Sequence, residues 1–402
     1  MKIAICGCGI GGLSAAILAH RYGFDVTVFD QFDTPAPVGS GLVIQPVGLR
    51  VLEQLGAADA ALAKGAKGYH MIGHEAKNGR TILDVSYGPK GGPNFGLGIH
   101  RSSLFGALLD VAIDEGIRIT TKHRVLSTQL KEDARYVSFD NGKTVGPFDL
   151  VIDTTGASST ISQIKSTPLP YGAIWGTVDW PENCTLQYDR LQQRYRRASN
   201  MIGVLPIGTL PNDDTPKAAL FWSLPRTQID AWHKAPIEQW RAQATALWPE
   251  LKPFTDQITE HSQMTPAVYT HGSLRKPFGE RIVHIGDAAH RASPQLGQGA
   301  NMALLDAAAL IECLRQFPLN QALEKYVKTR KLHTNTYQMM SWAFTPMYQS
   351  NSRSLPILRD YVLGPLSKIY PVPAILSSLV KGTLINPMRG LAQPTGQQSE
   401  TP

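Results

Sequence analysis

The sequence predicts an α/β protein, in which a Rossmann-like nucleotide-binding domain carries an inserted β-sheet domain and is followed by a C-terminal helical region. Three observations support this fold class. A strand, a glycine-rich turn and a helix follow one another from residue 2; residues 169–269 change to short, aromatic-rich β-like runs; and a buried strand over 281–285 resumes the first pattern. The expected limits are 1–165 and 275–345 for the two parts of the nucleotide-binding domain, 166–274 for the inserted domain and 346–402 for the tail.

The first of these segments is a βαβ unit. Residues 2–6 form a short apolar run, 14–22 have helical spacing with small residues on one face, and 25–30 form a second apolar run. The other expected helices cover 47–55, 101–114, 229–247 and 301–316, and the other expected strands cover 149–153, 173–178, 201–205 and 218–224. The Gly- and Pro-rich stretch 88–98 predicts a loop.

Composition and charge restrict the class of protein. With 402 residues and 43% hydrophobic content, the chain can form a large packed core. The net charge is +7, but Lys and Arg are scattered, which indicates weak attraction for anionic small molecules or a membrane surface rather than a nucleic acid partner.

The cysteines and the apolar runs indicate the compartment. The four cysteines include no C-x-x-C pair, so we expect no metal site and a reducing environment. No basic-then-apolar leader precedes the first strand, and no uncharged apolar run approaches the roughly 20 residues of a membrane span. We therefore expect a cytoplasmic protein.

A glycine-rich turn links the first strand to the first helix and has the spacing G-x-G-x-x-G. Gly7 permits the tight turn, Gly9 lets the backbone approach a pyrophosphate, and Gly12 allows close packing of the helix on the strand. Asp30 ends the second strand and is placed to accept hydrogen bonds from a ribose. These features predict dinucleotide binding but leave NAD and FAD open, because both cofactors use the same device.

A second glycine-rich segment separates these two cofactors. It reads Arg281-Ile-Val-His-Ile-Gly-Asp-Ala-Ala-His290, followed by Pro294-Gln-Leu-Gly-Gln-Gly-Ala-Asn301 and a helix that carries Asp306. This segment resembles the second FAD-binding motif of the class A flavoprotein monooxygenases, the p-hydroxybenzoate hydroxylase family. The resemblance implies an FAD-binding domain that holds FAD non-covalently and an inserted domain that binds substrate.

The same resemblance implies roles for individual residues. Asp287 would hold the ribityl chain of FAD, and Gly299, Ala300 and Asn301 would place a helix N-terminus against the flavin pyrimidine ring. Negative charge on the reduced ring would be stabilised there by free backbone N–H groups. Pro294 would lie in the loop over the flavin face at which substrate reacts.

The resemblance extends over residues 2–160 and 275–345. The segment from Val38 to Pro46, which includes Gly41, is similar to the family's segment over the flavin edge. Arg101, with Leu104, matches an R-x-x-L helix start and would approach the FAD phosphates or ribityl chain, although a solvated arginine at a helix start is the alternative.

One segment departs from the family pattern. The family has an Asp-Gly motif with a following Ser and Arg, which are implicated in flavin and NAD(P)H binding. Here Thr155 replaces the acid and Ser162 replaces the arginine, while Gly156 and Ser159 remain. FAD binding is still expected, and the departure bears on reduction by NADH or NADPH.

The resemblance implies an NAD(P)H-consuming monooxygenase that hydroxylates a small, aromatic substrate with O2 through a flavin C4a-hydroperoxide. Two alternatives remain open: a flavin-dependent reductase or dehydrogenase on the same fold, and a flavin-binding protein without turnover. No residue is recognisable as a catalytic base. The candidate pocket residues, each of which could instead serve packing, are Pro294, Phe221, Ser223, Trp175 and Tyr69. Trp175 and Trp222 could form an aromatic wall or belong to the core.

The tail over 354–390 is apolar, Pro-punctuated and basic. It could rest on an anionic membrane, cover the substrate entrance or pack on the main body. The last ten or so residues are expected to be disordered, and the protein is expected to be a monomer or a homodimer.

Overall fold

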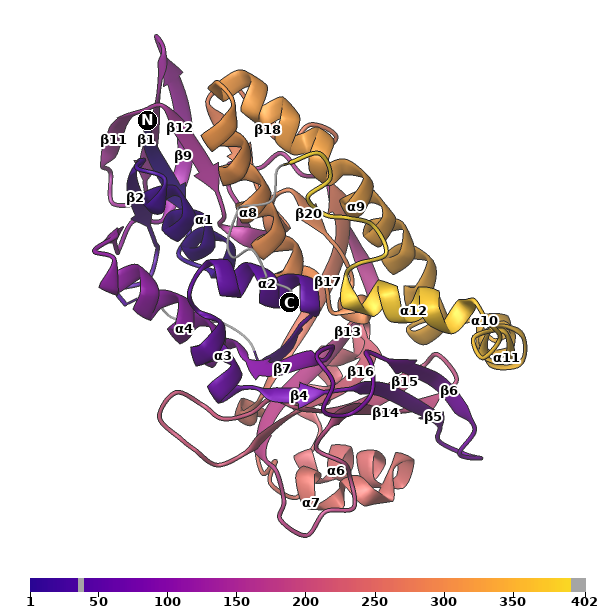
Figure 1. The fold of residues 1–402 in the computed structure, drawn as a ribbon. Helices are drawn as coiled ribbons and strands as arrows, with labels where there is room; N and C mark the ends of the chain where they lie inside the picture. The colour runs from indigo at the N-terminus through magenta and orange to yellow at the C-terminus, as the bar shows by residue number, and fades with distance from the viewer. Residues whose placement is uncertain (35–39, 392–402) are drawn as a thin grey trace.

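The structure, a computed structural model that describes residues 1–34 and 40–391, is built around a twisted six-stranded sheet (Figure 1). Its strand order is β18-β19-β12-β1-β2-β8, and all neighbours are parallel except the edge pair of β18 and β19. The strands are β1 (Lys2–Cys6), β2 (Asp25–Phe29), β8 (Arg118–Thr120), β12 (Leu150–Asp153), β18 (Phe278–Gly279) and β19 (Ile282–His284). The sheet therefore joins an N-terminal segment to one that follows residue 277.

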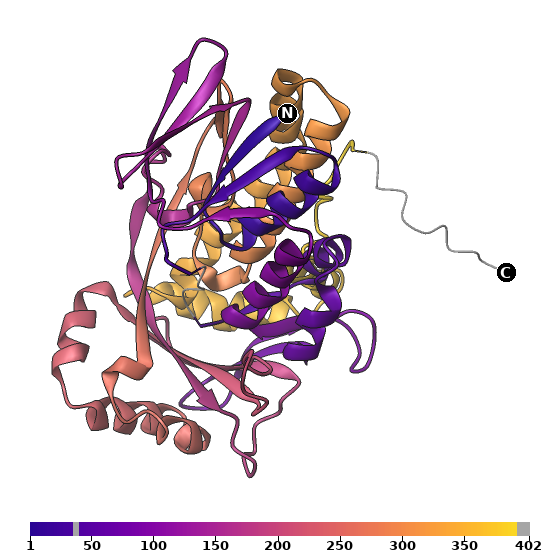
Figure 2. The ribbon, with the colours of Figure 1, turned by 90° about the vertical axis from the view of Figure 1, so that its left-hand side faces the viewer.

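The two faces of this sheet have different covers. One face packs against the helices α1 (Ile10–Arg21), α4 (Arg101–Asp114) and α8 (Gly299–Gln316). The other face is covered by a three-stranded sheet of β9 (Val125–Lys131), β10 (Ala134–Phe139) and β11 (Thr144–Phe148), which appears at the upper left of Figure 2. Side chains of β1 accordingly alternate between two cores, with Ile5 on the helical side and Ala4 on the other.

A second, eight-stranded sheet lies below the first in Figure 1 and has the order β20-β17-β13-β16-β15-β14-β5-β6. Its strands are β5 (His70–Glu75), β6 (Thr81–Ser86), β13 (Thr167–Asp179), β14 (Arg190–Arg196), β15 (Asn200–Pro206), β16 (Lys217–Pro225), β17 (Met264–Ser273) and β20 (His290–Arg291). Two of them precede residue 166, so this sheet draws on more of the chain than the expected inserted domain. The domain limits given in the sequence analysis remain predictions.

The two faces of the eight-stranded sheet also differ. One is buried under α5 (Ile229–Lys234), α6 (Ile237–Leu247) and α7 (Lys252–Thr255), and this core includes Trp222. Trp222 is therefore a packing residue on the face opposite to Trp175, and the two side chains do not form a common aromatic wall. The opposite face carries Phe221 and looks toward Val43 of the FAD-binding part and Tyr348 at the end of the C-terminal helix α9 (Leu319–Tyr348).

Smaller elements connect the two sheets. A three-stranded sheet consists of β3 (Gly41–Ile44), β4 (Ala66–Gly68) and β7 (Gly96–His100), and two helices lie beside it, α2 (Pro46–Gln54) and α3 (Ala58–Lys64). Short 3-10 turns are η1 (Gly156–Ser158), η2 (Arg226–Gln228), η3 (Pro249–Leu251), η4 (His261–Gln263), η5 (Gly286–Ala288) and η6 (Pro294–Leu296). The expected loop over 88–98 therefore ends in a strand.

The C-terminal region is helical, as the sequence predicts. It consists of α9 (Leu319–Tyr348), α10 (Ser354–Leu358), the π-helical turn η7 (Arg359–Leu363), α11 (Gly364–Leu366) and α12 (Val372–Lys381). Among the described helices, none combines the length and the apolar composition needed to cross a membrane. The prediction of disorder for the last ten residues falls outside the described residues.

Candidate functional site

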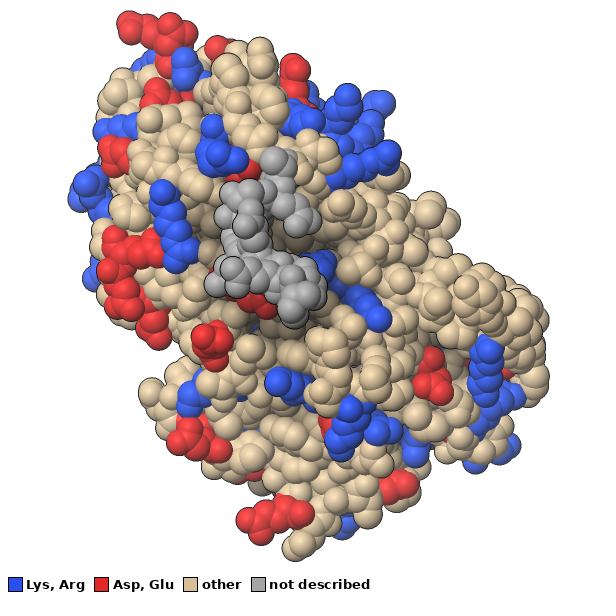
Figure 3. All heavy atoms as spheres, viewed as in Figure 1, with Lys and Arg blue, Asp and Glu red and all other residues tan. Residues whose placement is uncertain are grey.

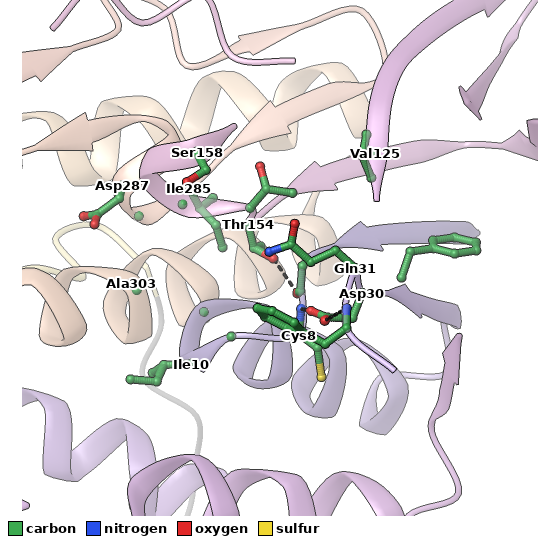
Figure 4. A pocket seen from close by; sticks show the side chains of 18 of the residues that line it. Cys8, Ile10, Asp30, Gln31, Val125, Thr154, Ser158, Ile285, Asp287 and Ala303 are labelled. Carbon is green, nitrogen blue, oxygen red and sulfur yellow. Dashed lines mark hydrogen bonds between the residues drawn. The ribbon is translucent and has the colours of Figure 1, made fainter. Parts of the chain in front are cut away.

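A cavity of about 340 Å³ lies at the carboxyl ends of the parallel strands, between the N-termini of α1 and α8. This is the position at which open α/β sheets bind nucleotides. Asp30 and Asp287 line the cavity, and Figure 4 shows them on opposite sides of it, with Thr154 and Ile285 between them. The cavity is therefore elongated and runs across the ends of the strands.

The three glycines of the first motif have different surroundings. A Cβ on Gly12 would stand 1.9 Å from the carbonyl oxygen of Gly7, so the close contact of α1 with the turn requires glycine. Gly7 has a φ of +109°, and its Cβ would meet the carbonyl oxygen of Thr154 at 2.7 Å. A Cβ on Gly9 would meet nothing within 4 Å, because Gly9 borders the open cavity.

The N-terminus of α1 is open to an anion. Its N-cap is Gly9, no side chain caps it, and its first turn contains no acidic residue. The first backbone N–H groups of a helix lack internal partners and carry the positive end of the helix dipole. A phosphate group in the cavity would satisfy both features.

Asp30 is fixed by the backbone around it. One carboxylate oxygen, Oδ2, accepts a hydrogen bond from the Cys8 N–H at 2.8 Å, and Oδ1 accepts one from the Phe32 N–H at 3.0 Å. Each carboxylate oxygen has a further lone pair. Asp30 can therefore hold the glycine-rich turn in place and still accept a hydroxyl group from the cavity.

Asp287 lies in the turn η5, on the other side of the cavity. The surrounding protein raises the pKa of its carboxyl group by desolvation, and the charges of His290, Arg101 and Arg291 oppose that rise. Arg101 also lines the cavity, and burial lowers its pKa while the charge of Asp287 acts in the opposite direction. The two predicted residues thus lie close enough to interact.

A buried charge network holds the turn η5. Asp306 of α8 is fully buried and accepts hydrogen bonds from the Gly286 N–H at 3.0 Å, from His290 Nε2 at 2.6 Å and from Arg330 Nε at 2.8 Å. Burial alone would raise the pKa of Asp306, but the charges of His290 and Arg330 lower it well below its usual range. His290 is consequently a structural residue beside the cavity.

The N-terminus of α8 reaches the cavity through Gly299 and Ala300, and no side chain caps it. Asn301 is fully buried, and its side chain points into the protein. Its Oδ1 accepts a hydrogen bond from the Gln45 N–H at 2.8 Å, and its Nδ2 donates to the carbonyl oxygens of Val43 and Gly297. Asn301 therefore positions β3 against α8.

Gly41 is explained by packing. A Cβ at this position would come within 2.4 Å of the Ile207 Cγ2 and 2.9 Å of the Ala219 Cβ. Both are protein atoms, so glycine is needed here whether or not a cofactor is bound. The adjoining Val38 and Gly39 of the same predicted segment lie outside the described residues.

A buried carboxylate holds the segment in which Thr155 and Ser162 replace the acid and the arginine of the family pattern. Asp153, at the end of β12, accepts hydrogen bonds from the Thr155 N–H and hydroxyl, from the Ser159 hydroxyl and from His284 Nδ1. Burial alone would raise the pKa of Asp153, and these hydrogen bonds lower it. The Ser162 hydroxyl donates to the Ala288 carbonyl at 2.6 Å. The segment is thus fixed to η5 without the expected acid and arginine.

Two candidate pocket residues face each other on neighbouring strands. Trp175 of β13 and Phe221 of β16 are register partners, and their ring centroids are 4.7 Å apart. The Trp175 indole N–H donates to the Tyr269 hydroxyl at 2.7 Å. On the same face, Gln349 Nε2 donates to the Ser223 Oγ at 3.2 Å. This face is the one that looks toward the FAD-binding part.

The other two candidates are in separate places. Pro294 begins η6, and the preceding Ser293 N–H donates to His271 Nε2 on β17, so this loop is attached to the eight-stranded sheet. Tyr69 is buried and packs edge-on against Phe95, with centroids 6.2 Å apart. The structure therefore separates Tyr69 from the aromatic pair on β13 and β16.

Several functional candidates were missed by the sequence analysis. Those that line the cavity are His123, Arg124, Val125, Thr154 and Thr160. On the aromatic face they are Tyr269 and Gln349. The pattern of the chain gave no signal for either group, because their positions follow from how distant strands pair.

The residues at the cavity fit an FAD molecule. The cavity is elongated, two uncapped helix N-termini open onto it, and a carboxylate stands on either side of it. The fold and this site together define a dinucleotide-binding oxidoreductase of the flavoprotein type.

The comparisons with known proteins identify the family. The profile described as "FAD binding domain" matches residues 1–340, and the chain belongs to this family as a class A FAD-dependent monooxygenase. Hispidin-3-hydroxylase of Neonothopanus nambi is 27% identical over 361 residues, which are 77% of this chain and 79% of that protein. 3-Amino-4-hydroxybenzoate 2-monooxygenase of Streptomyces cremeus is 24% identical over 355 residues, with coverage of 82% and 83%.

A solved structure agrees in fold. HpxO of Klebsiella pneumoniae, complexed with FAD and uric acid, superposes with a TM-score of 0.79 at 19% identity and covers 95% of this chain and 97% of its own. The p-hydroxybenzoate hydroxylase-like fold predicted from the sequence is confirmed, and so is FAD as the cofactor.

Proposed function

We propose that this protein uses NADH or NADPH together with O2 to hydroxylate a small aromatic substrate. The proposal is carried by the elongated cavity and, on the sheet face that looks toward the FAD-binding part, by the adjacent rings of Trp175 and Phe221, whose centroids are 4.7 Å apart. A flat ring can stack on such a pair. The name of the relative that acts on 3-amino-4-hydroxybenzoate supports an aromatic substrate.

The residues at the cavity would hold FAD along its length. The N-terminus of α1, beginning at Gly9, would bind the pyrophosphate, and Asp30 would accept the ribose hydroxyls. Asp287 would accept hydroxyls of the ribityl chain, and the N–H groups of Gly299 and Ala300 would face the flavin pyrimidine ring. When bound and reduced, FAD supplies the activation and transfer of oxygen, for which the C4a-hydroperoxide route stays a prediction.

Tyr269 and Gln349 would orient a phenolic substrate. Burial raises the pKa of Tyr269 to about 12, so its hydroxyl stays protonated near neutral pH. Because its oxygen already accepts the Trp175 N–H, its own O–H can donate to a substrate oxygen. The Gln349 Oε1 is buried without a partner among the described residues and can accept a proton donor of the substrate.

The substituted segment at Thr155 bears on whether NADH or NADPH reduces the flavin. The Thr155 hydroxyl is occupied by Asp153, so this segment presents no carboxylate of its own to a nicotinamide cofactor. If neither NADH nor NADPH reduces the flavin, one of the two alternatives, a flavin-dependent reductase or dehydrogenase on the same fold or a flavin-binding protein without turnover, replaces the monooxygenase proposal.

The test is to purify the protein, record its visible spectrum and follow NADH and NADPH oxidation with and without O2 in the presence of phenols and heteroaromatic acids. The expected result is a yellow protein whose oxidation of one nicotinamide is accelerated by an aromatic compound, with a product heavier by one oxygen atom. Nicotinamide oxidation that needs no O2 and adds no oxygen would contradict the proposal.

The compartment and the oligomeric state are part of the same proposal. All four cysteines are free, which suits the reducing cytoplasm. The expected monomer or homodimer can be distinguished from larger assemblies by light scattering.

A further inference from the structure

An apolar surface projects from the C-terminal region. The lobe formed by α10, η7 and α11 stands away from the rest of the molecule at the right of Figure 1. The large apolar side chains exposed on this lobe and on the turn after α11, called the tail patch below, include Ile357, Tyr361, Val362, Leu366, Ile369 and Tyr370. Tyr370 is 86% exposed and Ile369 59%. Folded proteins rarely expose so many large apolar groups together without an interaction partner.

The surface beside the tail patch is also uncharged. Trp342 and Met339 lie on the outward side of α9 and are strongly exposed. Figure 3 shows a wide area without charged residues over the second half of α9 and the C-terminal helices. The apolar surface is therefore larger than the lobe.

The lobe is held in place by polar contacts on its inner side. Arg359 is 2% exposed and donates from Nη1 to the carbonyl oxygens of Met347 at 2.8 Å and Arg197 at 3.1 Å. Asp360 pairs with Arg359 at 2.6 Å and with Arg80 at 3.2 Å. Because these anchors fix the backbone, the apolar side chains of the lobe are directed outward by the fold.

The charged residues of the C-terminal region over 340–391 are almost all basic. Asp360 is the single acidic residue between 340 and 391, and both of its partners are arginines. The exposed charges beside the tail patch in this stretch, Arg353 and Lys368, are basic, and Asp84 on the adjoining β6 is an exposed acidic residue. Anionic lipid headgroups attract basic residues, and Tyr and Trp side chains favour the interface between headgroups and acyl chains.

We propose that the tail patch docks this protein on the surface of an anionic lipid bilayer. The apolar tip would enter the interface, with Tyr361 and Tyr370 at headgroup level and Lys368 against the lipid phosphates. A second copy of the chain fits this surface less well, since a two-fold interface centred on the tail patch would bring Arg353 and Lys368 of the two copies near one another. This inference does not depend on the reaction proposed above.

The test is sedimentation of the full-length, FAD-loaded protein with vesicles of phosphatidylcholine alone or mixed with phosphatidylglycerol. We expect binding to the mixed vesicles that weakens as salt is added. Ile369→Glu combined with Tyr370→Glu should lower the affinity more than about tenfold, because each removes an apolar side chain from the interface. Lys368→Gln should lower it about fivefold on the mixed vesicles.

A matched control is Ile113→Glu on α4, since Ile113 is also 59% exposed but lies on the main body. This variant should bind vesicles as the wild type does. Flavin absorbance and circular dichroism verify that every variant is folded. Absence of vesicle binding by the wild type overturns the proposal. So does a wild-type dimer that the double substitution separates into monomers without any lipid dependence, which would assign the patch to a second copy.

Discussion

Replacing Gly9 by valine separates cofactor binding from folding. The backbone of Gly9 has φ −87° and ψ −172°, which valine adopts without strain. A Cβ at this position meets no atom within 4 Å. The free protein should therefore tolerate the substitution, with a loss of about 1 kcal/mol because valine is a poorer N-cap residue than glycine, or about 2 °C in Tm.

The effect on FAD should be much larger. The new side chain would occupy the place at which the pyrophosphate approaches the turn, and it would prevent at least one hydrogen bond from a backbone N–H to a charged phosphate. Such a bond contributes about 1.5–3 kcal/mol, which corresponds to a loss of affinity of about 10-fold to 150-fold. Steric overlap adds to this loss.

The assay is flavin fluorescence titration of the apoprotein together with thermal unfolding in the absence of FAD. Gly106→Val is the matched control, because its Cβ also meets nothing within 4 Å and Gly106 does not line the cavity. Gly12→Ala should instead impair folding itself, since its Cβ would stand 1.9 Å from the Gly7 oxygen. The reasoning fails if Gly9→Val binds FAD as tightly as Gly106→Val, or if its apoprotein unfolds.

Three further outcomes follow from the site. Asp287→Asn should weaken FAD about tenfold by removing a charged acceptor, and unchanged flavin content would exclude Asp287 as a ribityl ligand. Tyr269→Phe should leave FAD binding intact but lower kcat/KM for a phenolic substrate by about 2-fold to 12-fold, and an unaltered value would remove Tyr269 from the pocket. Burial disfavours the charged form of His290, yet Asp306 raises its pKa. The resulting stabilisation is complete below the unfolded value of about 6.5 and is lost as pH rises through the folded pKa, so His290→Gln should lower Tm more at about pH 6 than at about pH 9. An equal loss of Tm at both pH values would contradict the assigned ion pair of His290 with Asp306.

The nucleotide-binding unit was predictable because its signals are local. The strand over 2–6 and the helix over 101–114 have the predicted limits, and α1 begins four residues earlier than predicted because its glycines are already helical. The spacing of Gly7, Gly9 and Gly12 can be recognised in the sequence because each glycine is required by the adjacent turn or helix start.

The eight-stranded sheet was less predictable because its pairings are distant. β5 pairs in parallel with β14, which lies more than a hundred residues further along the chain, and no pattern within either strand encodes that choice. The register decides which side chains face the FAD-binding part. The pairing of β13 with β17 shifts its register between Pro168 and Gly172, and Tyr269 of β17 lies at this irregularity. The contact of Tyr269 with Trp175 could therefore not be derived from the alternation of side chains along the strands.

Buried polar residues are the other part of the site that the sequence analysis could not predict. Asp306 and Asn301 occur on a helix whose other buried residues are mostly apolar, and the sequence gives no partner for either. The structure supplies them: Asp306 fixes the turn that carries Asp287, and Asn301 fixes β3 beside the N-terminus of α8. Because both act on the cavity through the backbone, substitutions at these positions should weaken FAD binding by displacing the groups that contact it. Function in this fold therefore depends on residues that need not touch the cofactor, and only the three-dimensional arrangement reveals them.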